Sequence, residues 1–218
     1  MTALSNNMSG LRNRVYDIVP ALNNLSLIPG NIKLWPHFTE QFPVETIIIK
    51  NESLCEELEN NIRQEGPHSL SSTKCLMTKL NMHEEHDSFA TVGDYAINLA
   101  QSCPVAKRTT SDGKKEVVPL RLKETWGLLY VKGNQANIHN HWPFLWSYTY
   151  CVKAGKCCAP LRFPTAMKEL AIVPEIGQLI VFPACVMHEV HEHTCDHERI
   201  MISGNLEVDW DAQWQRTI

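Results

Sequence analysis

The sequence lacks long apolar runs and a marked charge excess, and both absences restrict the class of protein. No stretch of its 218 residues approaches the roughly 20 apolar residues that a helix needs to cross a bilayer. The formal net charge is −4, whereas a strongly basic balance would favour nucleic acid as a partner. The first residues also lack the basic and apolar regions of a signal peptide. We therefore expect a cytoplasmic protein that has neither a membrane nor a nucleic acid as a partner.

Cysteine is abundant, but the spacing of the common zinc motifs is missing. The chain has eight cysteines, and without a secretion signal we expect reduced thiols rather than disulfides. No Cys-x-x-Cys pair occurs, which argues against a structural zinc site of the common type. The histidines on either side of the last cysteine are expected at exposed loop or strand-edge positions: His191, His193 and His197.

The first part of the chain, up to about residue 117, carries the signals of one strand and two helices. Residues 44–49 are rich in β-branched side chains and predict a strand. A helix is expected next, capped by Asn51 or Ser53. Its apolar residues recur on one face: Leu54, Leu58 and Ile62. A second helix is expected over about residues 92–102.

From about residue 118 onward, short apolar segments alternate with turns. About seven or eight strands at this spacing are typical of a jelly roll or sandwich. The expected strands cover residues 126–131, 145–152, 161–163, 170–173, 179–182, 186–191 and 199–208. The predicted fold class is mainly β with N-terminal helices, a cupin-like jelly roll or double-stranded β-helix. One domain is expected over 1–218, in which 1–117 support a β core at 118–209.

Three histidines occur in a pattern that suits one metal ion. His139 and His141 follow a strand-like stretch and are two residues apart, and in a strand such positions point to the same face. His188 follows a second strand-like stretch, at 177–183. Together they can place three imidazoles around one ion. Imidazole suits iron, zinc, copper and nickel alike, so residue type alone does not choose the metal.

An arginine at the start of the last strand suggests an anion site. Alternation along 199–206 places Arg199 on one face with Met201, Ser203 and Asn205, and the apolar Ile200, Ile202 and Leu206 on the other. An arginine that faces a barrel interior needs a partner, because an isolated buried charge costs several kcal/mol. The carboxylate of a small co-substrate would satisfy it. A protein carboxylate such as Glu198 or Glu189 is the alternative.

Further motifs accompany these residues in the C-terminal half. They are His139-x-His141-x-Pro143, Ser147-Tyr148-Thr149-Tyr150, the segment 177–183, His188-Glu189-Val190 and Arg199-x-x-x-Ser203-x-Asn205. With these motifs in this order, residues 118–209 resemble the 2-oxoglutarate- and Fe(II)-dependent oxygenase superfamily. The likeness is greatest to its prolyl-hydroxylase-like members and to a 2-oxoglutarate-Fe(II) oxygenase family of marine bacteria and phages.

The resemblance implies a role for each site residue. His139 and His188 would bind Fe(II), and Arg199 would bind the C5 carboxylate of the co-substrate 2-oxoglutarate. Tyr130 and Tyr150 would contact that co-substrate, with Tyr148 as an equal alternative to Tyr150 in register. The implied reaction uses O2 to hydroxylate a peptide residue or a small metabolite, with release of succinate and CO2.

His141 is the departure from the usual pattern, because most of the superfamily carries Asp or Glu at that position. As a third metal ligand it would leave the site more positive by about one unit. Two other functions therefore stay open. One is a three-histidine, cupin-type dioxygenase that does not use 2-oxoglutarate. The other is a non-enzymatic binding module whose β-sandwich is stabilised by a closed, four-coordinate zinc.

Overall fold

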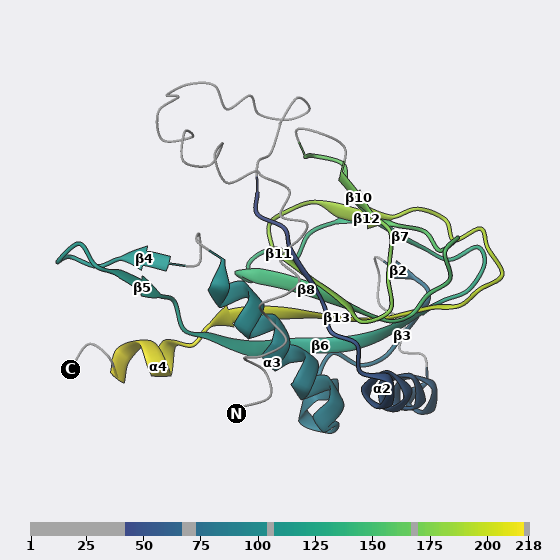
Figure 1. Ribbon diagram of the computed structural model, residues 1–218, viewed down its shortest axis with the longest axis horizontal. Helices are drawn as coiled ribbons and strands as arrows, with labels where there is room; N and C mark the ends of the chain where they lie inside the picture. Colours follow the sequence, from purple (N-terminus) through teal and green to yellow (C-terminus); the bar gives the residue numbers. More distant parts are fainter. Residues whose placement is uncertain (1–41, 67–72, 104–106, 167–169, 216–218) are drawn as a thin grey trace.

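Two facing antiparallel sheets, covered on one side by helices, form the protein (Figure 1). The computed structural model describes residues 42–66, 73–103, 107–166 and 170–215. The larger sheet has the strand order β1-β11-β8-β13-β6-β3 and the smaller one has the order β10-β9-β12-β7-β2. The fold is mainly β and has the jelly-roll architecture that the strand spacing predicted.

The strands of the larger sheet are β1 (Glu45–Ile48), β3 (Leu76–Met77), β6 (Leu120–Tyr130), β8 (Trp146–Lys153), β11 (Gln178–Pro183) and β13 (Arg199–Val208). Those of the smaller sheet are β2 (Thr73–Lys74), β7 (Gln135–His139), β9 (Leu161–Phe163), β10 (Leu170–Ile172) and β12 (His188–Val190). A separate hairpin consists of β4 (Lys107–Thr109) and β5 (Lys115–Val117). The helices are α2 (Glu52–Glu65), the short 3-10 helix η1 (Met82–Glu84), α3 (Asp87–Ser102) and α4 (Trp210–Gln215).

Helix α2 forms where the sequence predicted it, and Asn51 is its cap. The Asn51 side chain accepts a hydrogen bond from the backbone N–H of Leu54, at 3.1 Å. Ser53 lies inside the helix and donates its hydroxyl to Asn51, so the alternative cap is not used. The predicted apolar face is buried. The helix ends at Gly66, whose φ of 74° favours a residue without a Cβ.

Helix α3 begins five residues before its predicted start. It spans Asp87–Ser102, and the preceding His86 makes no side-chain capping bond. The residue at the N-cap is therefore not of a type that marks a helix start in the sequence. Ala96 and Leu99 are buried as expected, and Tyr95 is partly buried against the same core. No helix in the described ranges is long and apolar enough to cross a membrane.

The larger sheet separates two apolar layers. Its outer face packs on the helices, and its inner face packs on the smaller sheet (Figure 1). The outer layer includes Leu58, Ile62, Phe89, Val92, Leu179, Val181, Ile200 and Ile202. The inner layer includes Trp126, Leu128, Tyr130, Phe163, Ile180, Phe182 and Met201. Successive residues of β11 and β13 thus alternate between the layers, as the period of a strand requires.

Some strands lay outside the sequence prediction. The N-terminal support region contributes β1 and β3 to one sheet and β2 to the other, as well as its helices. Strand β7 was not predicted, because its residues Gln135, Ala136 and Asn137 lack the apolar alternation of a strand. The basic segment at 107–117 is the exposed hairpin β4-β5, whose turn contains Gly113 at a φ of 81°.

Candidate metal centre

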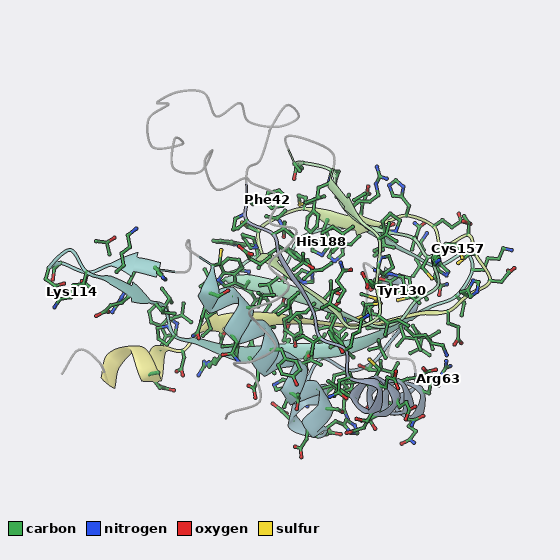
Figure 2. All side chains as sticks on the ribbon, in the orientation of Figure 1. Phe42, Arg63, Lys114, Tyr130, Cys157 and His188 are labelled. Carbon is green, nitrogen blue, oxygen red and sulfur yellow. The ribbon has the colours of Figure 1, made fainter. Side chains whose placement is uncertain are left out.

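Antiparallel pairing brings two of the three histidines face to face. His139 ends β7, His188 begins β12, and the two residues are directly paired in the smaller sheet. Their ring centres are 4.4 Å apart. His141 lies in the loop after β7, where its backbone N–H donates to Ala184 O at 2.7 Å. The larger sheet faces them across the inner layer, and Figure 2 places His188 in this interior.

The three imidazoles present donor atoms to a common point. One nitrogen from each lies within 4.8 Å of the other two. The Nε2 atoms of His141 and His188 are 3.2 Å apart. Two imidazole nitrogens bound to one metal ion at about 2.1 Å are separated by about 3.0 to 3.4 Å. This spacing is therefore that of two neighbouring ligands of one ion.

Backbone carbonyls orient two of the rings. The Nδ1 atom of His139 is 2.6 Å from Asn137 O, and the Nδ1 atom of His188 is 3.0 Å from Val186 O. A carbonyl only accepts, so each Nδ1 carries the proton and each Nε2 keeps a free lone pair. Histidines that bind metals are commonly held in this way by their second nitrogen.

The surroundings keep the three imidazoles neutral. Burial lowers the pKa of His139 below its usual value and lowers that of His141 to about 4. The pKa of His188 is lowered well below its usual value, first by burial and then by the two neighbouring histidines. Only neutral imidazole binds a metal, so the donor set is ready for an ion at neutral pH.

The histidines line a cavity of about 310 Å³ between the sheets. Its volume is at the lower end of the range for small-molecule sites, about 300 to 1,000 Å³. The walls combine the three imidazoles with the inner faces of the longest strands. From β6 and β13 the cavity is lined by Glu124, Trp126, Leu128, Tyr130, Arg199, Met201, Ser203 and Asn205. The predicted alternation of β13 is thus present in the cavity wall.

Arg199 is a buried cation with no acidic partner among the described residues. Its side chain is 3% exposed, and its Nε has no hydrogen-bond partner in the described part of the chain. Directly opposite on β6 lies Tyr130, and the guanidinium carbon is 4.8 Å from the centre of that ring. A cation–π contact of this kind orients the guanidinium but does not neutralise it. The geometry leaves Arg199 free to bind an anion in the cavity.

The two protein carboxylates considered as alternatives are engaged elsewhere. Glu198 forms ion pairs with Arg63 and Lys153 outside the cavity. Glu189 lies 2.8 Å from His191 Nε2 and 3.8 Å from Arg162 Nε. Neither carboxylate therefore compensates the charge of Arg199.

The structure brings Tyr130 to the cavity but not Tyr150. Tyr130 is 1% exposed, and burial raises the pKa of its hydroxyl above the usual value. The Tyr150 side chain points to the helix layer, where its hydroxyl donates to Ile49 O at 3.0 Å. Tyr148 shares that face and donates to Thr125 Oγ1 at 2.7 Å.

The parity of β8 explains this difference. Residues two apart share a face, so Tyr148 and Tyr150 both pack in the helix layer, whereas Ser147 and Thr149 face the cavity. Tyr148 also borders the cavity, but Tyr150 does not. Strand β8 is buried on both faces, so its sequence does not alternate between polar and apolar residues. The sequence alone therefore does not indicate which of its faces lines the cavity.

A polar chain at the far end of the cavity was not predicted. Ser147 donates to Asn205 Oδ1 at 2.8 Å, and the Asn205 amide donates to Glu124 Oε2 at 2.8 Å. Asn205 was placed on the correct face by alternation, but its neighbours on β6 and β8 could not be assigned without the sheet order. These three residues give the cavity a polar, acidic end opposite Arg199.

Aromatic residues around His141 divide between rim and core. Trp142 is 73% exposed and Phe144 is partly buried, and both line the cavity. Trp146, in contrast, packs in the helix layer. The two lining residues form an apolar rim beside the metal motif.

No protein-family model and no curated protein matches the chain, but solved structures share its fold. A viral collagen prolyl hydroxylase from Paramecium bursaria Chlorella virus-1, solved as a 2-oxoglutarate complex, is 15% identical with a TM-score of 0.58. The match covers 75% of this chain and 94% of that one. A Pseudomonas putida prolyl-4-hydroxylase is 16% identical with a TM-score of 0.53, over 76% and 92% of the two chains.

The Streptomyces hygroscopicus protein HygX, solved with nickel and 2-oxoglutarate, is 10% identical with a TM-score of 0.52. That match covers 77% of this chain and 83% of HygX. The chain therefore has the fold of the 2-oxoglutarate- and Fe(II)-dependent oxygenases. In this fold, the convergent histidines belong to the smaller sheet and its adjoining loop, and Arg199 belongs to the larger sheet.

Proposed function

We propose that this protein is a Fe(II)- and 2-oxoglutarate-dependent oxygenase that hydroxylates a peptide residue or a small metabolite, with release of succinate and CO2. One observation carries the proposal. A buried arginine that has no acidic partner among the described residues and three convergent neutral imidazoles line the same cavity. The structural likeness to proteins solved with 2-oxoglutarate supports it.

The donor set fits a bound Fe(II). His139, His141 and His188 would hold it through the imidazole nitrogens that converge at the cavity wall. With three neutral ligands, the charge of the ion is not reduced by the protein. A dianionic co-substrate would compensate the charge of the ion with one carboxylate and pair with Arg199 through the other. Each end of 2-oxoglutarate would therefore bind a positive group.

Arg199 and Tyr130 define the place of the distal carboxylate. A guanidinium offers a planar fork of N–H donors that matches a carboxylate. The Tyr130 ring holds the guanidinium from one face, and the inner apolar layer excludes water around the pair. Both effects strengthen a charge-assisted hydrogen bond.

Bound iron and 2-oxoglutarate would supply the oxidising chemistry, and the protein would orient and shield them. The substrate is expected between the metal centre and the polar end of the cavity. Ser147, Asn205 and Glu124 offer it hydrogen-bond donors and acceptors there, and Trp142 and Phe144 cover the apolar approach. The cavity lining does not by itself distinguish a peptide from a free metabolite.

An anaerobic titration tests the proposal. Apoprotein receives Fe(II) and then 2-oxoglutarate, while the weak visible charge-transfer band of the chelated complex is followed. We expect the band in the wild type, its loss in His188→Ala, and its retention in the matched control His191→Ala, whose side chain is exposed. A wild-type protein that binds Fe(II) without the band would contradict the co-substrate assignment.

Three neutral imidazoles also suit a dioxygenase that binds its substrate directly to the metal. The two functions differ in their need for 2-oxoglutarate. O2 uptake that is indifferent to 2-oxoglutarate would favour the three-histidine dioxygenase. A tightly held zinc at these histidines, with no exchangeable water, would favour the structural module.

A further inference from the structure

A second group of metal-ligand side chains lies outside the cavity, where two loops meet. The loop between β8 and β9 contributes Cys157 and Cys158, and the loop between β12 and β13 contributes His193, Cys195 and His197. These loops are at the end of the molecule where Figure 2 labels Cys157. His193, expected at an exposed position, is in fact fully buried. The cluster therefore needs an explanation that the sequence spacing did not provide.

The inner part of the cluster is a compact triangle. Cys158 Sγ is 3.9 Å from Cys195 Sγ, Cys195 Sγ is 3.5 Å from His193 Nε2, and Cys158 Sγ is 4.0 Å from that same nitrogen. For tetrahedral zinc, two sulfur ligands are about 3.8 Å apart, and a sulfur and a nitrogen are about 3.6 Å apart. All three sides of the triangle lie within half an ångström of these values.

A second triangle shares Cys195. It consists of Cys157, Cys195 and His197, with Cys157 Sγ 3.2 Å from His197 Nδ1. Cys157 is exposed, and His197 lies beside it in the opposite loop. Cys157 is thus a third thiol, available as the fourth ligand beside the inner triangle.

The thiols are not joined in disulfides. None of the eight cysteines forms a disulfide, and a sulfur–sulfur distance of 3.9 Å is far beyond the roughly 2.05 Å of a disulfide bond. In the metal-free arrangement, His193 Nε2 donates to His197 O at 2.6 Å. A metal ion on Nε2 would displace that proton, and the neutral ring would then carry its proton on Nδ1 in place of the 3.5 Å contact with Ala159 N.

We propose that this cluster is a second metal site, a zinc site of the Cys3His type with Cys157, Cys158, Cys195 and His193 as ligands. His197 hydrogen-bonds the Cys157 sulfur from outside the ligand set. Thiolate-rich, tetrahedral sets select zinc or Cu(I) over the oxygen-preferring cations. The ligands come from an adjacent cysteine pair and a His-x-Cys segment. This spacing differs from Cys-x-x-Cys, so the sequence motif did not predict the site.

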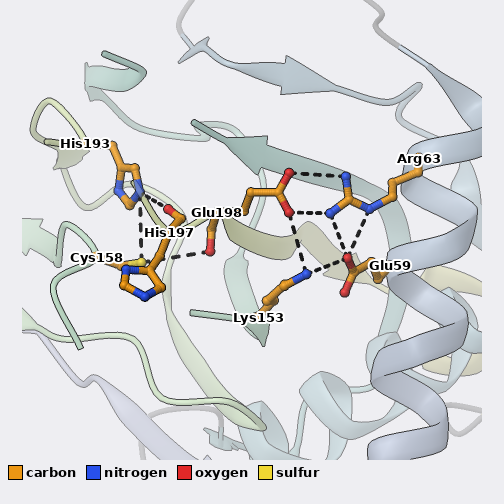
Figure 3. Close-up of polar contacts among 7 residues, drawn as sticks. All are labelled: Glu59, Arg63, Lys153, Cys158, His193, His197 and Glu198. Carbon is orange, nitrogen blue, oxygen red and sulfur yellow. Dashed lines mark hydrogen bonds and ion pairs between the residues drawn. The ribbon is translucent and has the colours of Figure 1, made fainter. Parts of the chain in front are cut away.

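The place of the site in the chain gives it a structural purpose. The loop that carries His193 and Cys195 joins β12, which begins at His188, to β13, which begins at Arg199. Glu198, at the end of this loop, also forms ion pairs with Arg63 and Lys153 (Figure 3). A metal would fasten the other side of the loop to the β8-β9 loop. If the proposed function holds, it would thereby help to position the anion-binding arginine.

Metal analysis and cobalt substitution test the site. Full-length protein is purified reduced and without chelator, dialysed, and its zinc content measured. It is then titrated with Co(II), because a thiolate-to-cobalt charge-transfer band in the near ultraviolet arises at a thiolate site and not at an all-imidazole one. The variants are Cys195→Ser, His188→Ala to remove a ligand of the other centre, and Cys185→Ser as an exposed-thiol control.

We expect one retained zinc and a thiolate–cobalt band in the wild type, in Cys185→Ser and in His188→Ala, and the loss of both in Cys195→Ser. Retention in His188→Ala separates this site from the proposed oxygenase centre. If Cys195→Ser does not fold, two other measurements test the site. Cys157→Ser should lose the zinc and the band, and a chelator should lower the Tm of the wild type. Reduced wild type that keeps no zinc and shows no thiolate band would overturn the proposal, as would an intact mass lower by two hydrogens from a Cys158–Cys195 disulfide.

Discussion

The guanidinium of Arg199 lies over the ring of Tyr130, its paired residue on the neighbouring strand, with 4.8 Å between the guanidinium carbon and the ring centre. The pair holds a positive charge at one end of a cavity whose other end is acidic. The two ends of the cavity therefore carry side chains of opposite charge. A carboxylate is therefore favoured beside Arg199 and disfavoured beside Glu124.

Substitution of Arg199 should separate co-substrate binding from metal binding. Loss of a hydrogen bond between charged groups costs about 1.5 to 3 kcal/mol, so Arg199→Ala should weaken 2-oxoglutarate binding by about 10- to 150-fold. Its affinity for Fe(II) should stay as in the wild type. Calorimetric titrations of both ligands measure this, with the exposed Arg121→Ala as control. Equal 2-oxoglutarate affinity in the two variants would refute the anchor role.

His141 offers a test of the ligand set itself. His141→Ala should weaken Fe(II) binding by more than about 100-fold, because even residues that only support a ligand contribute 10- to 100-fold. His141→Asp, which restores the usual carboxylate, should bind Fe(II) far better than the alanine variant. The loop should survive both changes, since it is held by the backbone bond from residue 141 to Ala184. Anaerobic Fe(II) competition titrations measure the affinities, and wild-type affinity in His141→Ala would exclude the residue as a ligand.

The ion pairs of Glu59 should make stability depend on pH. Burial disfavours ionisation of Glu59, but hydrogen bonds from Lys153 and Arg63 outweigh it, so the pKa is lowered from 4.5. A lowered pKa in the folded state stabilises the protein above pH 4.5, and this contribution is lost as pH falls through the folded-state pKa. We expect Glu59→Gln to cost about 0.5 to 1 kcal/mol at pH 7.

Urea unfolding at several pH values measures this effect. The difference between wild type and Glu59→Gln should shrink as pH falls below 4.5. Glu57→Gln, on the exposed side of the same helix, should differ little from wild type at any pH. A Glu59→Gln deficit that does not change with pH would show that the cost is one of packing.

Gly127 should be intolerant of a larger residue. A Cβ there would lie 2.3 Å from Ile62 Cγ1, and Ile62 is fully buried between α2 and the sheet. Gly127→Ala should therefore destabilise the protein by about 1 to 3 kcal/mol through overpacking. The Gly127→Ala/Ile62→Ala double variant should lose less unfolding free energy than the two single variants lose together. The reason is that the smaller side chain at position 62 leaves room for the added methyl group. Strictly additive unfolding free energies would contradict this contact.

The sequence predicted the features that depend on local periodicity. Helix α2 has a cap and an apolar face within fourteen residues, and β13 alternates between two chemically different faces. The likeness of the histidine motifs and Arg199 to a known family indicated the fold, which the structural comparisons confirm. The roles of these residues in binding iron and 2-oxoglutarate stay predictions.

Features that depend on strand pairing could not be read in the same way. Tyr150 has the residue type of a cavity contact, but its strand is buried on both faces, so only the sheet order determines where it points. His193 lies in a polar, charged segment that is typical of an exposed loop, and it is buried where it contacts the β8-β9 loop and the turn at Gly133 and Asn134. The Cys and His cluster escaped prediction for the same reason, since its members are about 35 to 40 residues apart.

The candidate centre takes its histidines from one sheet and its arginine and tyrosine from the other. A molecule that touches both sets would act as a cross-brace between the two walls of the jelly roll. By mass action, such a molecule stabilises the native state alone, because the unfolded chain cannot present both walls together. Resistance to heat and to proteolysis would then rise with occupancy, so that the loaded and empty forms of the protein would differ in lifetime as well as in chemistry.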